Sequence, residues 1–79
     1  MEGMVEKRLI DVEKGGQAVV AKLKNDINMK NRLMSIGLVE GTLICPLYES
    51  ASGGPRAYGF RGSVFAIREE DAKNIIVNV

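Results

Sequence analysis

The sequence NMKNRLMSIGL, residues 28–38, carries three apolar side chains at the spacing of one helical face: Met29, Leu33 and Ile36. Asn28 can accept a hydrogen bond from a free backbone N–H of the first turn, and Gly37 stands where a left-handed residue ends a helix. The stretch therefore predicts a short helix over about Asn28–Ile36. Two turns of helix are not stable alone, so we expect its apolar face, with Leu38, to pack on a core.

Runs of β-branched and apolar residues flank this helix on both sides. Five of them are typical of strands: residues 18–24, 42–48, 57–60, 63–68 and 75–79. Arg61-Gly62 separates two of these runs by two residues and predicts a tight hairpin. Glu69–Lys73, with three acids at its start, predicts a single helical turn.

The run 42–48 alternates between two faces, with Leu43, Cys45 and Leu47 on one of them. We expect this face to point inward, which makes Cys45 a small buried apolar residue. Pro46 cannot donate a hydrogen bond to a neighbouring strand, so it predicts an edge position or a β-bulge.

The order of the elements favours a mainly β fold, a small antiparallel β-barrel of about five strands with one inserted helix. Residues 1–7 are predicted to form a flexible tail, and residues 8–79 a single domain. Three glycines are expected to serve the turns between elements: Gly37, Gly41 and Gly62.

The composition excludes most kinds of enzyme. The chain has 79 residues, no histidine and a single cysteine, so it has no disulfide, no histidine-based catalytic triad and no self-contained zinc site of the usual kind. We therefore predict no catalytic, cofactor-binding or metal-binding residues. The formal net charge of +1 gives none of the basic excess of a dedicated nucleic-acid binder. The acidic and basic N-terminal residues do not resemble a signal peptide, which indicates the cytoplasm.

Several motifs occur in order along the chain: LIDVEKGGQAVVAKL (9–23), RLMSIGLVEGTLI (32–44) and GFRGSVFAIREEDAKNIIV (59–77). In this order and at these spacings they resemble the FeoA family of bacterial ferrous-iron uptake proteins. The same domain occurs at the C-terminus of diphtheria-toxin-repressor-like metal regulators. The resemblance implies an SH3-like barrel and an accessory role on FeoB, the membrane ferrous-iron transporter with a cytoplasmic GTP-binding domain. It also implies recruitment to the inner face of the membrane and, at most, a weak association with Fe²⁺.

Six residues are candidates for contact with such a partner: Arg32, Met34, Leu38, Tyr48, Arg56 and Tyr58. Structural alternatives stay open for most of them: Leu38 could fill the core, Met34 could lie at its edge, Arg32 could be solvated surface, and the tyrosines could form cross-strand core pairs. The leading hypothesis is a protein-binding module that affects the assembly, gating or GTP hydrolysis of the transporter. The alternative is a regulatory or nucleic-acid-binding small barrel, although no nucleic acid is expected as a partner.

Overall fold

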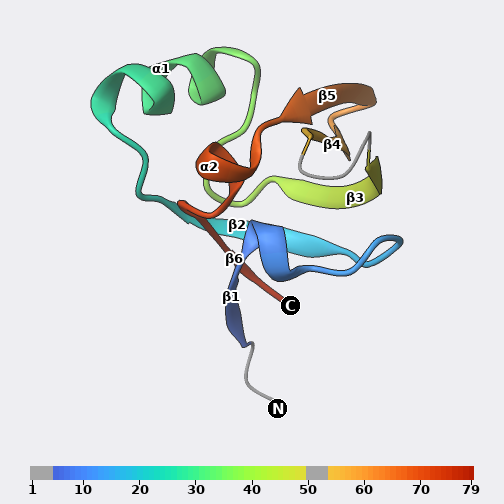
Figure 1. Cartoon of the computed structure of the whole chain (residues 1–79). Helices are drawn as coiled ribbons and strands as arrows, with labels where there is room; N and C mark the ends of the chain where they lie inside the picture. The colour runs from blue at the N-terminus through green and yellow to red at the C-terminus, as the bar shows by residue number, and fades with distance from the viewer. Residues whose placement is uncertain (1–4, 50–53) are drawn as a thin grey trace.

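The structure is a computed structural model that describes residues 5–49 and 54–79. Figure 1 shows a strongly bent sheet with helices beside it. The elements follow one another as β1 (Glu6–Arg8), a 3₁₀ turn η1 (Leu9–Asp11), β2 (Ala18–Leu23), α1 (Ile27–Ser35), β3 (Leu43–Glu49), β4 (Arg56–Phe60), β5 (Ser63–Ile67), α2 (Glu69–Ala72) and β6 (Ile75–Asn78). The prediction of a mainly β fold with one inserted helix and one later helical turn is confirmed.

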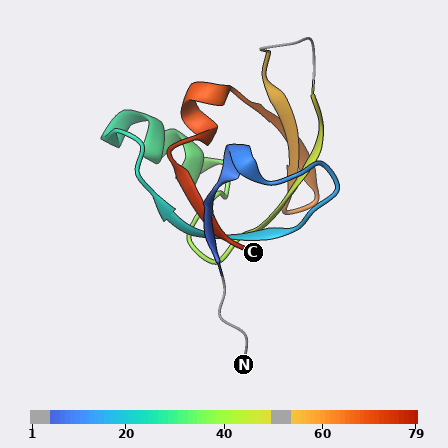
Figure 2. The ribbon, with the colours of Figure 1, turned by 60° about the horizontal axis from the view of Figure 1, so that its bottom comes forward.

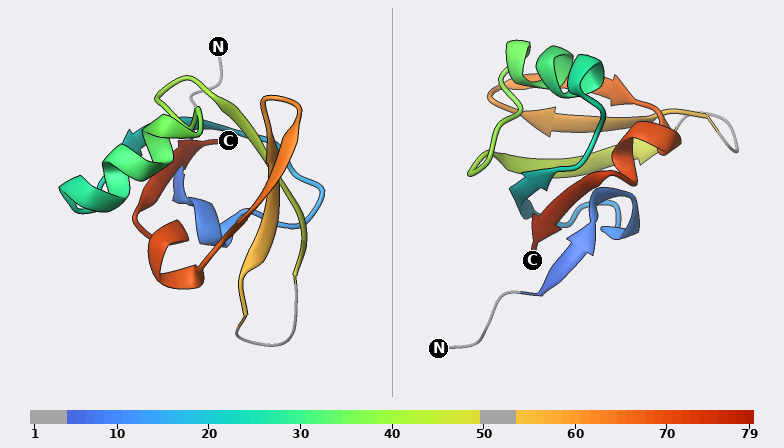
Figure 3. Two further views of the ribbon diagram at one scale, coloured as in Figure 1. Left: turned by 90° about the horizontal axis from the view of Figure 1, so that it is seen from above. Right: turned by 90° about the vertical axis from the view of Figure 1, so that its left-hand side faces the viewer.

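The strands form one antiparallel sheet in the order β1-β6-β2-β3-β4-β5. The sheet curls around its own inner face, as the views in Figure 2 and Figure 3 show. Within residues 5–49 and 54–79, six strands are present instead of about five, because Glu6 and Lys7, predicted as tail, pair with the end of β6 together with Arg8. The backbones of Val5 and Val79 extend this ladder by two hydrogen bonds of 3.2 and 3.0 Å.

Helix α1 begins one residue earlier than predicted, and its N-cap is Asp26. The Asp26 carboxylate accepts a hydrogen bond of 2.9 Å from the backbone N–H of Met29, whereas Asn28 lies inside the helix. Helix α1 ends at Ser35, one residue before the predicted Ile36, and the predicted left-handed glycine follows it. Gly37 has φ +96°, and the N–H groups of Gly37 and Leu38 donate to the carbonyls of Met34 and Leu33 in a Schellman motif.

Replacing Asp26 by alanine tests this N-cap. The substitution leaves the Met29 N–H without its side-chain acceptor, so we expect the free energy of unfolding to fall by about 1 kcal/mol. Urea unfolding followed by circular dichroism measures the change. Asn28→Ala is the matched control, with a change below about 0.5 kcal/mol, and a larger effect of Asn28→Ala than of Asp26→Ala would contradict the assignment.

The β4–β5 hairpin turns through Arg61 and Gly62, with φ +54° and +78°. Two positive φ values in a two-residue loop are the geometry of a type I′ turn, which matches the twist of the flanking strands. Gly41, with φ +92°, also adopts the left-handed conformation that a glycine provides at no steric cost.

The inward face of β3 is the opposite of the one predicted. Ile44 and Pro46 are buried in the core, whereas Leu43 is 51% exposed and Cys45 is only half-buried. Pro46 is tolerated because the β2–β3 ladder ends at Ile44, and the β3–β4 ladder has a bulge immediately after Pro46.

The core fills the concave side of the sheet. Its fully buried side chains come from η1, β2, β3, β4 and β6 and from the loop after α1, and they include Leu9, Val20, Leu38, Ile44, Tyr58, Ile75 and Val77. From α1, Leu33 is buried and Met29 packs against the core, but Ile36 is 37% exposed, so the predicted third residue of the helical face lies at its margin. The helix is therefore held mainly through Leu33 and through Leu38 beyond its end.

Candidate functional site

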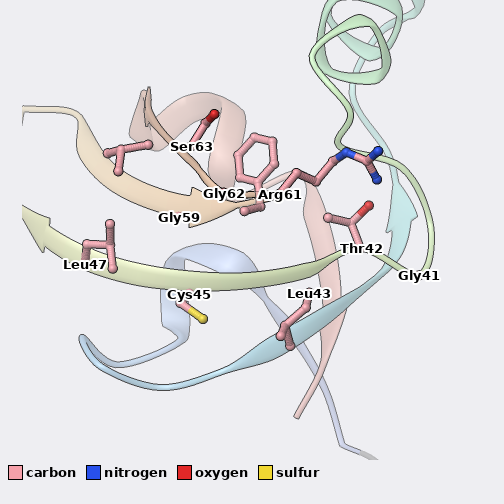
Figure 4. A pocket seen from close by; sticks show the side chains of 11 residues that line it. Gly41, Thr42, Leu43, Cys45, Leu47, Gly59, Arg61, Gly62 and Ser63 are labelled. Atoms are coloured by element: carbon pink, nitrogen blue, oxygen red, sulfur yellow. The ribbon is translucent and has the colours of Figure 1, made fainter.

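A row of residues crosses the convex face of the sheet from β3 to β5. Cys45 lies opposite Gly59 in the β3–β4 ladder, and Gly59 lies opposite Val64 in the β4–β5 ladder. Directly paired residues point to the same side of a sheet, so the two flanking strands carry apolar side chains where the middle strand carries none. A groove therefore runs along β4 (Figure 4).

Gly59 forms the floor of this groove. A Cβ at this position would lie 3.2 Å from Cδ1 of Leu47, which is closer than ordinary van der Waals contact. Leu47 thus leans over the backbone of the glycine from β3. Any larger residue at position 59 would displace Leu47 and fill the groove.

The groove is a hollow of about 540 Å³, a size typical of sites for small ligands or single side chains of a partner. Its walls are mostly apolar, with Leu43 51% exposed and Val64 56% exposed. Exposed apolar side chains that gather around a concavity are characteristic of interaction sites. This face of the sheet is therefore the strongest candidate for a binding site.

Arg61 lies at one end of the groove, beside Gly41 and Thr42, and Leu47 lies toward the other end (Figure 4). The Arg61 side chain packs across Gly37, because a Cβ on that glycine would come within 2.6 Å of Cδ and 2.8 Å of Nε of Arg61. The guanidinium therefore lies near the C-terminal end of α1, where the helix dipole favours a cation.

Thr42 fixes the loop between α1 and β3 at this end of the groove. Its hydroxyl donates to the Gly37 carbonyl at 3.2 Å and accepts from the Val39 N–H at 3.1 Å. The side chain is 8% exposed. Both hydrogen bonds lie within the loop, so they fix its own backbone conformation at the polar end of the groove.

Two of the six predicted contact residues are part of the core. Leu38 and Tyr58 are fully buried, with 0% exposure, so their side chains offer no surface to a partner. We therefore remove both from the candidate contact set. The reason for Tyr58 is its register opposite Pro46 and Phe65, which places it on the concave face of the sheet.

Arg56 is a half-buried structural clamp. Its two terminal nitrogens donate to the carbonyls of Ile10 and Val12, each at 3.1 Å, and its guanidinium lies 5.6 Å from the centre of the Tyr58 ring. These contacts tie the segment around η1 to β4. Arg56 thus joins parts of the chain that are far apart in sequence.

Arg56→Met tests the clamp. Methionine keeps much of the apolar stem and loses both hydrogen bonds to carbonyls, so we expect the free energy of unfolding to fall by about 2–3 kcal/mol. Chemical denaturation measures the change. An effect below about 0.5 kcal/mol would contradict the structural role, and the exposed Arg32→Met serves as the control.

The other three predicted contact residues are exposed but lie apart. Arg32 lines a smaller hollow of about 290 Å³ between α1 and β5, and Met34 lines a third hollow beside Leu23 and Val39. Tyr48 is 59% exposed near the far end of β3. The structure does not bring these three side chains into one site, and none of them lines the groove.

The groove residues themselves were missed as a site. Leu43 and Cys45 were assigned to the core, and Gly59 and Val64 were read only as parts of strands. The sequence predicts Arg61 in the hairpin turn, and the structure confirms this position. A glycine inside a strand is the signal that could have pointed to this groove, because it often marks a close approach of another group.

The described residues hold no group of three or more Cys, Asp or Glu side chains placed to bind a metal ion. No helix in the described part of the chain is long and apolar enough to cross a membrane.

Outside the groove, a hydrogen bond from the Arg8 guanidinium holds the pKa of the Asp11 carboxyl below its ordinary value. Both side chains are about half exposed.

Comparison with known proteins agrees with this architecture. A FeoA protein from Chlorobium tepidum has a TM-score of 0.86 and 26% identity, over 91% of this chain and 69% of that one. A zinc-bound FeoA from Stenotrophomonas maltophilia, described as an SH3 domain protein, has a TM-score of 0.70 and 25% identity, over 87% and 86% of the two chains. A manganese-dependent transcriptional repressor, 19% identical, shares the fold with a TM-score of 0.85 over 92% of this chain and 36% of its own.

The sequence comparisons point the same way. A search of curated protein sequences found no significant match. The FeoA domain, however, matches residues 7–79, nearly the whole chain. The fold is accordingly SH3-like, and the chain belongs to the FeoA family, which is associated with ferrous iron transport.

Proposed function

We propose that this protein is a cytoplasmic binding module of ferrous iron uptake that contacts the cytoplasmic region of a FeoB-type membrane transporter. The observation that carries the proposal is the groove, in which Leu43 and Val64 expose apolar surface on either side of Gly59. A partner that covers this apolar surface removes it from water, and this favours association. The description of the Stenotrophomonas maltophilia relative, which suggests a ferrous iron transport activating factor, supports the same role.

The role in transport is that of a binding partner and not of a catalyst. The groove is lined by aliphatic side chains, glycines, one cysteine, two hydroxyl residues, an aromatic ring and one guanidinium, a set without a general base. Binding to the transporter would act on its assembly, gating or GTP hydrolysis.

The nucleic-acid alternative gains little support from the groove, which the exposed Tyr48 does not line. Single-stranded nucleic acids are bound by exposed aromatic rings in a basic groove. Tyr58 and Phe60 are buried, and Arg61 is the charged residue among the described residues that line the groove.

Amide chemical shifts of the isotopically labelled protein test the proposal when the transporter's cytoplasmic region is added. We expect the shifts to concentrate on Leu43, Gly59 and Val64. If neither this region nor the full-length transporter in lipid nanodiscs perturbs any amide, the proposal is wrong. Binding to single-stranded oligonucleotides that weakens steeply with salt would favour the alternative instead.

A further inference from the structure

The shape and charge of the groove point to the chemistry of its occupant. We propose that the groove binds an extended peptide segment that packs an apolar side chain against Leu47 and Val64 beside Gly59 and presents a carboxylate to the Arg61 guanidinium at the end of the groove. This inference rests on the proposed function and specifies which segment of the partner is recognised.

The course of β4 suits an extended peptide. β4 ends at Phe60, and Arg61 follows it in the hairpin turn at one end of the groove. The Arg61 stem packs across Gly37, so the guanidinium lies beside the C-terminal end of α1. A peptide that lies along β4 can therefore place one side chain beside Gly59 and a later acidic side chain toward the guanidinium.

The contacts at Gly59 favour an apolar side chain of moderate size. Leu47 already lies against the glycine from one side, and Val64 flanks it from the other strand. Cys45 lies opposite on β3 and is half-buried. Leucine, isoleucine or valine from the partner would contact all three of these side chains and exclude water from them.

The charge at the end of the groove favours a carboxylate. The Arg61 guanidinium has no hydrogen bond or ion pair with any other side chain within residues 5–49 and 54–79. A guanidinium binds a carboxylate through two parallel hydrogen bonds, which fixes orientation as well as charge. A membrane surface would instead call for several cations, and the described lining of the groove contains Arg61 alone.

Arg61 is held in place by the turn of its backbone and by the packing of its side-chain stem. Its backbone has φ +54°, a value at which asparagine, aspartate or glycine is preferred in this turn, and its stem packs across Gly37. Because the stem is held in this way, the guanidinium needs little further ordering when a ligand binds, and this lowers the entropic cost of recognition.

Two blocked peptides test the inference by titration into the labelled full chain: acetyl-Gly-Leu-Ser-Asp-Gly-amide and the same peptide with asparagine in place of aspartate. We expect the first to shift Gly59, Val64 and the Arg61 Nε signal, and to bind about threefold to tenfold more tightly than the second. Arg61→Gln should abolish this difference, because glutamine keeps a similar backbone cost without the charge. Lys73→Gln, an exposed charge loss at the end of α2, should preserve it.

Equal binding of the two peptides, or an unchanged preference in Arg61→Gln, would overturn the inference. A second result would also overturn it: the parent chain co-sediments with phosphatidylglycerol vesicles, Arg61→Gln does not, and neither peptide binds. Binding of the parent chain and of Arg61→Gln to the transporter's cytoplasmic region distinguishes failure of this inference from failure of the proposed function. If Arg61→Gln binds the transporter's cytoplasmic region like the parent chain, the carboxylate contact is wrong and the binding module stands. If the parent chain itself does not bind the transporter, the proposed function fails whichever peptide binds.

Discussion

Leu38→Ala is expected to lower the free energy of unfolding by about 3–5 kcal/mol. Leu38 has 0% exposure, and its N–H closes the C-terminal turn of α1 on the Leu33 carbonyl. Removing three carbon atoms leaves a cavity at the point where the helix is joined to the core, so the loss combines apolar transfer with lost packing. For a chain of this size, such a loss is comparable to half of the usual total stability.

Urea unfolding followed by circular dichroism measures this loss. Met34→Ala, in the same segment but at a side chain that is 45% exposed, is the matched control, with an expected change below about 1 kcal/mol. Equal effects of the two variants would show that Leu38 does not anchor the helix. Because Leu38 has no exposed surface, any loss of transporter binding in Leu38→Ala should follow the fraction of unfolded protein.

Leu43→Asp is expected to weaken binding to the transporter's cytoplasmic region by at least about thirtyfold, which corresponds to roughly 2 kcal/mol at a central interface residue. The substitution replaces exposed apolar surface in the groove with a charge. Isothermal titration calorimetry with the isolated cytoplasmic region measures the change.

Ile27→Asp is the control for this variant. Among the large apolar residues that the structure describes, Ile27 is the most exposed, at 66%. It lies in the first turn of α1, where an acid suits the helix dipole. We expect it to leave binding within about twofold. Both variants should unfold within about 1 kcal/mol of the parent chain. If the two weaken binding equally, the groove is not the contact surface.

Local signals accounted for the parts of the fold that could be predicted from the sequence. The left-handed glycine at position 37 and the two-residue loop at Arg61-Gly62 each specify a backbone shape within a few residues, and both were placed correctly. The N-cap was assigned to Asn28 because asparagine and aspartate are nearly equal in this role. Only the position of the first helical turn shows that Asp26 is used.

The face of β3 could not be predicted in the same way. Both of its faces carry apolar residues, so the alternation defines two sides without showing which one is buried. The choice depends on long-range pairing, in which Cys45 meets Gly59 on the outside and Pro46 meets Tyr58 on the inside. The groove was missed for this reason, because its walls were counted as core.

Strand β1 was missed because it contains only charged residues, Glu-Lys-Arg, and all three are exposed. Such a strand has no apolar pattern, and its membership in the sheet comes from backbone pairing alone. Charged side chains on an outer strand also hinder pairing with other chains, a common protection of sheet edges.

The place of β6 in the sheet has a consequence for biosynthesis. β6 lies between β1 and β2 and pairs with both, yet it follows every other strand in the sequence. A nascent chain that still lacks β6 therefore has no partner for β1 and leaves one edge of β2 open. The sheet can be completed only after translation has passed Asn78, and the long separation between paired residues such as Arg8 and Ile76 predicts slow folding for a domain of this size.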